Sequence, residues 1–243
     1  ALVAVPRAAR TTRESFAATL GRGLADQHAV LPLRPDSLRR LDRVDTVVID
    51  PRVLCDGRLR VVAVRGAADG ELAAVWACAQ ARLDDDGLRP GWHPVGDRGP
   101  VAEALYLPMH HPLAAAVVGE ARRSGVEVIS VDTDVLEDLR PVFDEIQSFD
   151  IGSLDDALAT VVTDLQRDGR YVAVLSSTAS RALSAADVAL GIVGNTGPPP
   201  WYADLLLPDL QGAWRVLHAL PAARAAGRRG TEIATGASAL GAL

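Results

Sequence analysis

Short apolar runs alternate with longer amphipathic segments along most of the chain. The apolar runs lie at 46–50, 126–131, 171–175, 187–193 and 204–207. They are rich in Val, Ile and Leu, as buried parallel strands are. Apolar residues at helical spacing in 111–124 and 153–168 predict helices between these strands, and a further helix is expected at about 134–143. Strands that alternate with helices predict an α/β fold with a doubly wound, mostly parallel sheet.

Helices are also predicted near both ends of the sequence. Residues 11–26 carry apolar positions on one helical face, and the Ala-rich tail, 210–243, has the composition of a helix. Arg224, Arg228 and Arg229 precede a mostly apolar end. Such a cluster fits the cytoplasmic flank of a membrane helix. An ordinary amphipathic terminal helix fits the pattern equally well.

The α/β rhythm is interrupted between residues 66 and 100. We expect a strand at 58–65, a helix at 69–82, and then a loop over 83–100, where Gly, Pro and Asp dominate. The acidic run 84–86 could suggest a cation site. A solvated turn is the better interpretation, because three adjacent carboxylates do not converge on one ion without a loop built for it.

Composition excludes several classes of function. The 243 residues are 49% hydrophobic with a net charge of −6, and no basic patch is interleaved with aromatic residues. We therefore expect no nucleic-acid partner. Cys55 and Cys78 form no metal-binding pattern, so we expect no metal and two reduced thiols. All 25 basic residues are arginine, so no mechanism can use a lysine ammonium.

Asp50 is the first candidate for chemistry. It ends the run DTVVID, where a buried parallel strand would deliver a carboxylate to the carboxyl edge of the sheet. Ligands of open α/β sheets bind at that edge. An ordinary aspartate at a turn is the alternative.

Four segments together resemble P-type cation-transporting ATPases. RVDTVVIDPRVLCDGRLRVVAV is similar to that family's phosphorylation segment, DTVxFDKTGTLTxGRLxV. ALYLPMHHPLAAAVVGEARRSGVEVISVDTD resembles the stretch that ends in TGD, and DLQRDGRYVAVLSSTASRALSAADVALGI resembles the stretch around GDGxND. ADLLLPDLQGAWRVLHALPAARAAGRR resembles the run into the fifth membrane helix. The resemblance covers most of the chain in the family's order.

The resemblance implies a domain plan and a location. The chain would be the cytosolic loop between the fourth and fifth membrane helices, with a haloacid dehalogenase-like fold, at the cytoplasmic face of the cell membrane. Its partners would be other cytosolic domains or membrane helices of the same protein. The implied parts are a stalk or linker at 1–40, a phosphorylation-type domain at 41–65 and 101–209, a reduced insertion at 66–100 in place of the nucleotide-binding domain, and a stalk helix at 210–243.

The first departure from the family falls on the phosphate clamp. Asp50 stands where the family carries its phosphorylated aspartate. The Lys, Thr, Gly and Thr that follow in the family are replaced here by Pro51, Arg52, Val53 and Leu54, with one residue missing. Pro51 has no N–H to offer an oxyanion, and Val53 cannot take glycine geometry cheaply.

The other motifs are altered as well. TGD becomes Asp132, Thr133 and Asp134, which places a second carboxylate where the family binds phosphate. The family's lysine falls near Leu158. The family's Mg²⁺ motif, GDGxND, is represented by Ser176, Ser177, Thr178, Ser180 and Arg181. Since Mg²⁺ prefers charged oxygen ligands, we expect neither Mg²⁺ nor ATP on this segment.

Three functions remain open from the sequence. The first is a degenerate phosphorylation domain with a structural or regulatory role. The second is an active ATP-driven transporter domain in which Arg52 clamps the phosphate and Asp50 is phosphorylated. The third is a soluble haloacid dehalogenase-type phosphatase, which would need a general acid where Arg52 stands. The run from His110 to Pro112 invites comparison with the SExHP motif of heavy-metal members, but its place before the helix at 111–124 argues against it.

Overall fold

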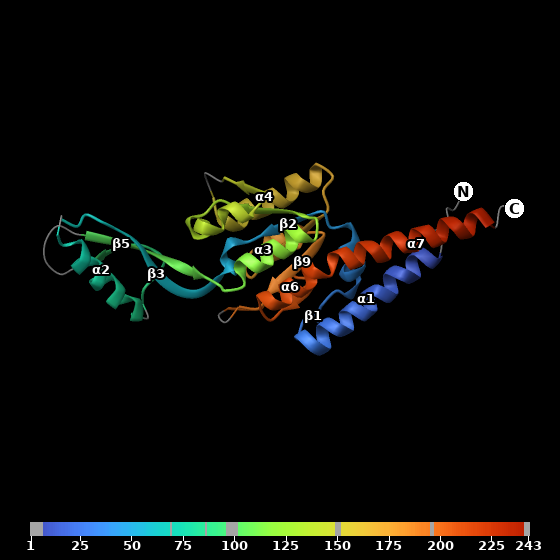
Figure 1. Ribbon diagram of the computed structural model, residues 1–243, viewed down its shortest axis with the longest axis horizontal. Helices are drawn as coiled ribbons and strands as arrows, with labels where there is room; N and C mark the ends of the chain where they lie inside the picture. The colour runs from blue at the N-terminus through green and yellow to red at the C-terminus, as the bar shows by residue number, and fades with distance from the viewer. Residues whose placement is uncertain are drawn as a thin grey trace.

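The molecule is elongated and has three parts, which follow one another along its length (Figure 1). A small antiparallel cap lies at one end, a seven-stranded sheet domain lies in the middle, and a pair of long helices projects from the other end. The computed structural model describes residues 7–68, 70–85, 87–95, 102–148, 152–194 and 197–240, with side chains described between residues 10 and 232.

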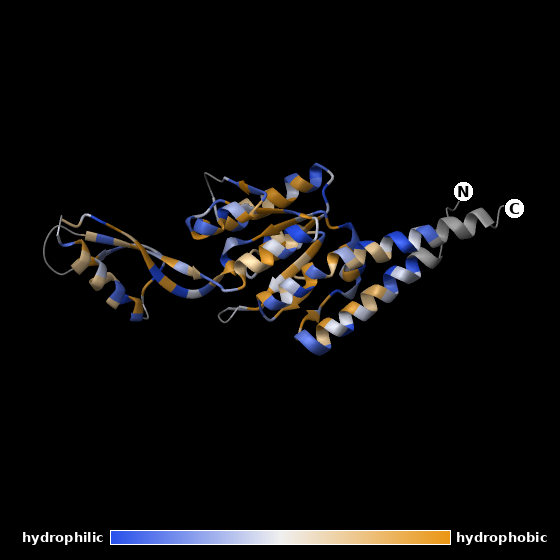
Figure 2. Cartoon of the chain, in the orientation of Figure 1, coloured by the Kyte–Doolittle hydropathy of each residue, from blue (hydrophilic) through white to orange (hydrophobic). Residues whose placement is uncertain are grey.

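The central sheet confirms the expected doubly wound α/β fold. Its strands, in spatial order, are β1 (Leu31–Pro32), β10 (Leu205–Leu207), β9 (Val188–Ile192), β8 (Val172–Ser176), β2 (Thr46–Ile49), β6 (Glu127–Val131) and β7 (Glu145–Gln147). All neighbouring pairs are parallel except β1 with β10. The strands form an apolar centre in Figure 2, as expected for a sheet covered on both faces.

Helices cover both faces of this sheet. The helices are α3 (Ala114–Arg123) and α6 (Leu210–His218) on one face, and α4 (Leu154–Arg167) and α5 (Ser180–Ala185) on the other. Side chains of β2 alternate between the faces, so that Ile49 packs in one core with Val117 and Val48 packs in the other with Leu158. This burial holds the end of β2 rigidly between its neighbours.

The cap is an antiparallel sheet with one helix. It contains β3 (Cys55–Arg65), β4 (Gly91–Val95) and β5 (Ala102–His110), in the order β3-β5-β4, and α2 (Leu72–Ala81). The fully buried Tyr106 fills its core and donates a hydrogen bond to the carbonyl of Ala79. The interruption of the α/β domain is therefore wider than the expected 66–100. The sequence predicted a loop where β4 lies, because β4 contains Pro94. An edge strand such as β4 tolerates a proline.

The described part of the acidic run, Asp84 and Asp85, ends a short 3-10 helix, η3 (Arg82–Asp84), in the cap. The Asp85 carboxylate accepts a hydrogen bond from the N–H of Gly87 at 3.1 Å, and Asp84 is exposed. Asp86 and Asp69, the first residue of the helix expected at 69–82, lie outside the described residues. No cluster of three or more metal-ligating side chains is found among the residues described.

The projecting part is an antiparallel pair of α1 (Arg7–His28) and α7 (Leu220–Leu240). A 3-10 helix, η1 (Pro35–Arg43), packs against both at the base of the pair. Within the described ranges, no helix is both long and apolar enough to cross a membrane. The helix expected at 134–143 is instead a kinked 3-10 segment, η4 (Asp134–Val142), which contains Pro141.

Gly191 in β9 supplies a test of how tightly the sheet is packed. A Cβ at this position would lie 2.6 Å from the Cβ of Ala203 and 2.7 Å from the Cγ of Pro200. We expect Gly191→Ala to lower the free energy of unfolding by about 1–3 kcal/mol, because neighbouring backbone must shift. Urea denaturation measures the loss. Gly23→Ala on α1, which meets nothing within 4 Å, is the control and should not destabilise.

Candidate functional site

The candidate site lies where β2 ends at the carboxyl edge of the sheet. Asp50 directly follows β2, is completely buried, and donates its N–H to the carbonyl of Leu175 on β8 at 2.9 Å. On the other side, Ser130 Oγ of β6 donates to the carbonyl of Ile49 at 2.8 Å. These bonds to both neighbouring strands fix the Asp50 backbone, and with it the direction of its carboxylate.

Arg52 clamps this carboxylate. The turn Pro51–Leu54 places the Arg52 N–H 3.0 Å from Asp50 Oδ1. The guanidinium then donates from Nε to Oδ1 at 2.9 Å and from Nη2 to Oδ2 at 2.8 Å. This is a two-pronged charge-assisted contact, the strongest geometry available to an arginine and a carboxylate. Both oxygens of Asp50 are therefore engaged by a residue only two positions along the chain.

Ser176 completes the shell around Asp50. Its Oγ donates to Asp50 Oδ2 at 2.6 Å. The same oxygen accepts the N–H groups of Thr178 and Ala179, at 3.2 and 2.9 Å. A hydroxyl has one proton and two lone pairs, so these three bonds use its full capacity.

Asp155 is a functional neighbour that the sequence did not reveal. It lies in the first turn of α4, and its Oδ1 accepts from Arg52 Nη2 at 2.6 Å. Burial opposes the charge on Arg52, but Asp50 and Asp155 outweigh it and raise the pKa of the guanidinium. The sequence does contain a signal for Asp155. Helices that follow strands in this fold begin at the carboxyl edge of the sheet, so an acidic residue in the first turn of such a helix lies near the site.

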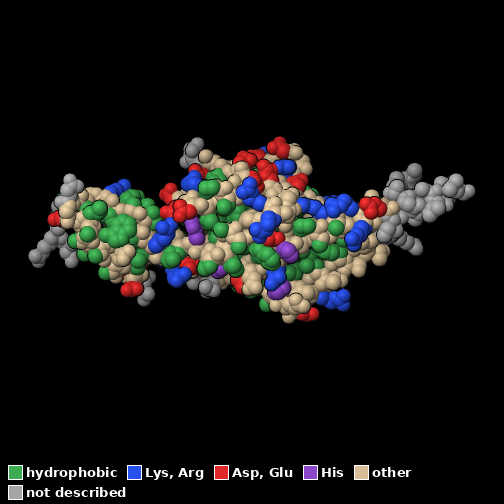
Figure 3. All heavy atoms as spheres, viewed as in Figure 1, with side chains coloured by type: hydrophobic (Ala, Val, Ile, Leu, Met, Phe, Trp, Pro, Cys, Tyr) green, Lys and Arg blue, Asp and Glu red, His purple; other side chains and the backbone are tan. Residues whose placement is uncertain are grey.

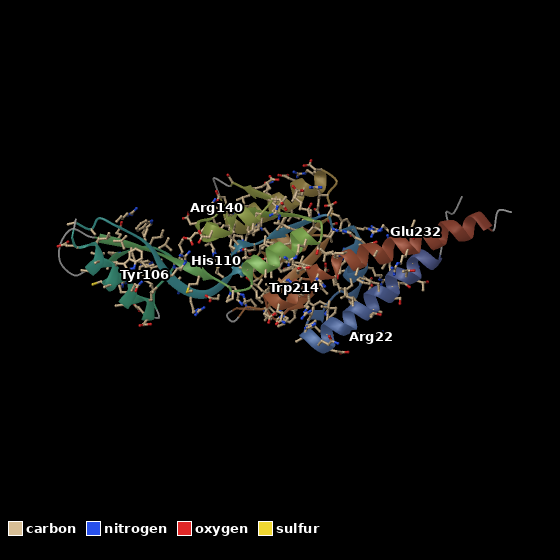
Figure 4. All side chains as sticks on the ribbon, viewed as in Figure 1. Arg22, Tyr106, His110, Arg140, Trp214 and Glu232 are labelled. Carbon is tan, nitrogen blue, oxygen red and sulfur yellow. The ribbon has the colours of Figure 1, made fainter. Side chains whose placement is uncertain are left out.

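The Asp132–Asp134 segment follows the neighbouring strand β6, but its side chains do not reach Asp50 by any described contact. Asp132 instead forms an ion pair with Arg140 Nη1 at 2.5 Å, on the side of the sheet domain near the cap (Figure 4). Thr133 Oγ1 is buried and has no hydrogen-bond partner among the described residues. Asp134 is exposed.

The remaining residues of the Ser176–Arg181 segment turn away from Asp50. Thr178 and Ser180 are exposed, and Ser177 is half-buried. Arg181 pairs with Asp156 on α4 rather than with the central carboxylate. Leu158, at the position of the family's lysine, is fully buried among apolar residues. Of the expected site residues, the structure brings Asp50, Arg52 and Ser176 into direct contact.

The cap is joined to the sheet domain beside this site. Arg60 of β3 forms an ion pair with Glu137 of η4, and His110 Nε2 of β5 lies 2.7 Å from the carbonyl of Val135. Glu137 has a φ of 31°, a strained value for a residue with a side chain. Burial, with Asp56 and Asp50 nearby, raises the pKa of the Cys55 thiol at this junction to about 11. Cys55 is consequently a neutral thiol at neutral pH.

Comparison with known sequences gives a consistent picture. No family model matches the chain. The chain is 32% identical over 287 residues to "Probable cation-transporting ATPase I" of Mycobacterium tuberculosis (strain H37Rv), covering 100% of this chain and 17% of that protein. The corresponding protein of Mycobacterium leprae is 31% identical over the same span. The chain is thus homologous to a part of these cation-transporting ATPases and spans about a sixth of their length.

Solved structures share the fold. A zinc-transporting PIB-type ATPase in the E2.Pi state superposes with a TM-score of 0.67 at 16% identity, over 95% of this chain and 50% of that one. The catalytic domain of the CPx-ATPase CopB-B gives a TM-score of 0.56 at 13% identity, over 79% of this chain and 95% of that one. The expected resemblance to P-type ATPases is confirmed in sequence by the mycobacterial relatives and in fold by these structures.

Proposed function

We propose that this chain, homologous to part of a cation-transporting ATPase, is a cytosolic phosphorylation-type domain of a membrane cation transporter that no longer transfers phosphate. Its role is structural or regulatory within the larger protein. The observation that carries the proposal is the Asp50 carboxylate, whose two oxygens are already bonded by Arg52 and Ser176. A nucleophilic carboxylate needs a free oxygen aimed at the phosphorus atom, and this one has none.

The residues around Asp50 do not suit Mg²⁺. The ion needs several oxygen ligands that present lone pairs, mostly from carboxylates and water. Here the groups that touch Asp50 are a guanidinium and a hydroxyl that both donate protons. The next carboxylate, Asp155, is itself paired with Arg52. A cation at this place would have to displace a guanidinium held by two carboxylates.

The size of the expected defect is large. Phosphoryl transfer depends almost wholly on positioning and on electrostatic stabilisation of the transferred group. Loss of one such stabilising group costs roughly 10²–10³-fold in rate. Here the lysine, the threonine hydroxyls and the metal-binding carboxylates are all replaced. The loss of several stabilising groups at once leaves negligible turnover.

A phosphate analogue supplies the test. We expect Mg²⁺ with beryllium fluoride to leave the melting temperature unchanged, because Asp50 has no free oxygen for the analogue. An analogue present at 100 times its Kd would add about 2.7 kcal/mol of stability. For a protein of this size that corresponds to a rise of roughly 5–10 °C. Differential scanning fluorimetry resolves such a rise easily.

Two results would contradict the proposal. One is a Mg²⁺-dependent rise in melting temperature that Asp50→Asn abolishes. The other is covalent transfer of label from γ-labelled ATP to the wild-type chain but not to the Asp50→Asn chain. Either would favour the active transporter domain instead.

A further inference from the structure

Arginines at the base of the helix pair lack the carboxylate partners that most other arginines of this chain have. Fifteen arginines form ion pairs with Asp or Glu, from Arg10 near the start to Arg181. Among the described residues, eight arginines form no ion pair with Asp or Glu, and three of these eight are Arg43, Arg224 and Arg228. All three line one groove, although they lie far apart in the sequence.

The groove has a volume of about 470 Å³ and lies where α1, α7 and the end of η1 meet. Four arginines line it, namely Arg13, Arg43, Arg224 and Arg228, against two carboxylates, Asp42 and Glu232. Figure 3 shows basic side chains gathered along this part of α7. The groove therefore carries an excess of positive charge in a chain whose net charge is −6.

The carboxylates of the groove do not neutralise this excess. Asp42 is nearly buried and is paired with Arg13 at 2.7 Å. Glu232 is exposed and forms no ion pair in the described part of the chain. Arg224 donates to the carbonyls of Ser124 and Val44, and burial, with Arg228 nearby, lowers its pKa despite the charge of Asp45. Arginines crowded in this way repel one another, and an anion between them would remove the repulsion.

We infer that this groove binds the phosphate headgroup of an anionic membrane lipid. Arginine matches phosphate because its fork of N–H groups can contact two oxygens at once. The groove lies on α1 and α7, which the resemblance to P-type ATPases makes the stalk next to the membrane. The inference therefore rests on the proposed function, a cytosolic domain of a membrane transporter. After Arg229 the sequence runs GTEIATGASALGAL, with a single charged residue. Basic residues beside such a segment are placed for contact with acidic headgroups.

Vesicle flotation of the whole chain tests the inference. We expect binding to vesicles of phosphatidylcholine mixed with the anionic lipid phosphatidylglycerol, and none to vesicles of phosphatidylcholine alone. Arg43→Gln with Arg228→Gln should weaken binding about 30-fold, because each arginine near an acidic surface contributes roughly fivefold. The matched control is Arg22→Gln with Arg89→Gln, which removes the same charge from exposed sites outside the groove. Arg22 lies toward the other end of α1 (Figure 4).

Three outcomes would overturn the inference: equal weakening by the control pair, equal binding to neutral vesicles, or full competition by millimolar inorganic phosphate, which would indicate a soluble anion. Circular dichroism checks that both double variants remain folded. The Asp50→Asn chain should float like wild type, because the groove is remote from Asp50. The two proposals can therefore fail separately. Transfer of label to Asp50 would contradict the proposed loss of phosphoryl transfer but not the lipid site, and failure of the wild-type chain to float would contradict the lipid site but not the proposed loss of phosphoryl transfer.

Discussion

Arg52→Gln should lower the free energy of unfolding by about 3 kcal/mol. The substitution leaves the Asp50 carboxylate completely buried without its counter-charge. Removing one partner of a buried ion pair typically costs about 3–5 kcal/mol. We take the lower end, because the Arg52 side chain is 37% exposed and Ser176 still donates to the carboxylate. Urea denaturation at neutral pH measures the change.

The chain offers a matched control a few residues away. Arg58 contacts Asp56 with the same spacing and the same donors, its backbone N–H, Nε and Nη2, although both guanidinium bonds go to Asp56 Oδ2. That guanidinium is exposed, so Arg58→Gln should change stability negligibly. The double variant Asp50→Asn with Arg52→Gln should recover more than half of the loss, because no buried charge remains. If Arg52→Gln proved no worse than Arg58→Gln, the clamp would not be a structural element.

Tyr106→Ala should unfold the cap while the central sheet stays folded. Tyr106 is the largest fully buried residue of the cap and belongs to an apolar cluster whose other buried members are Val61, Ala79, Val95 and Ala104. Truncation of a buried aromatic side chain costs about 3–5 kcal/mol, which is a large share of what so small a core can supply. Hydrogen exchange should therefore speed up by at least about 100-fold at the amides of β3 and β5.

The same experiment contains its own reference. The side chains of β2 and β8 pack in apolar clusters separate from that of the cap, so the amides of these strands should keep their protection from hydrogen exchange. Tyr106→Phe removes only the hydrogen bond to the Ala79 carbonyl and should cost about 1 kcal/mol. Faster exchange in β2 and β8 to the same extent would mean that the cap and the sheet unfold as one unit.

The central fold could be predicted from sequence because its signals are local. Each parallel strand is a run of buried Val, Ile and Leu, and each crossover helix has its own apolar stripe. The cap could not, since β4 contains Pro94 and a glycine at its start, both of which resemble loop signals. The 3-10 form of η4 was not predicted either. Pro141 is a local signal against an α-helix there, whereas the unusual φ of Glu137 depends on the tertiary structure.

The candidate site, like the fold, could be predicted from the sequence only in part. The position of Asp50 follows from its strand, and its contact with Arg52 is local. The contact with Asp155 joins residues 103 positions apart. The start of α4 places Asp155 near the carboxyl edge of the sheet, but the local pattern does not specify its contact with Arg52. The outward direction of Arg181 likewise depends on Asp156, which lies on another helix. Sequence alone could name the altered motif residues, but not which of them remain in contact.

The antiparallel pair of α1 and α7 has a mechanical consequence. The first turn of α1 and the last turn of α7 lie at the same end of the molecule (Figure 1). A domain attached through a single helix can rotate about the axis of that helix, whereas attachment through two packed helices prevents this rotation. The orientation of the sheet domain relative to these helix ends therefore depends on how α1 and α7 pack. A small change in the angle between the two helices would displace the cap, which lies at the opposite end of the molecule.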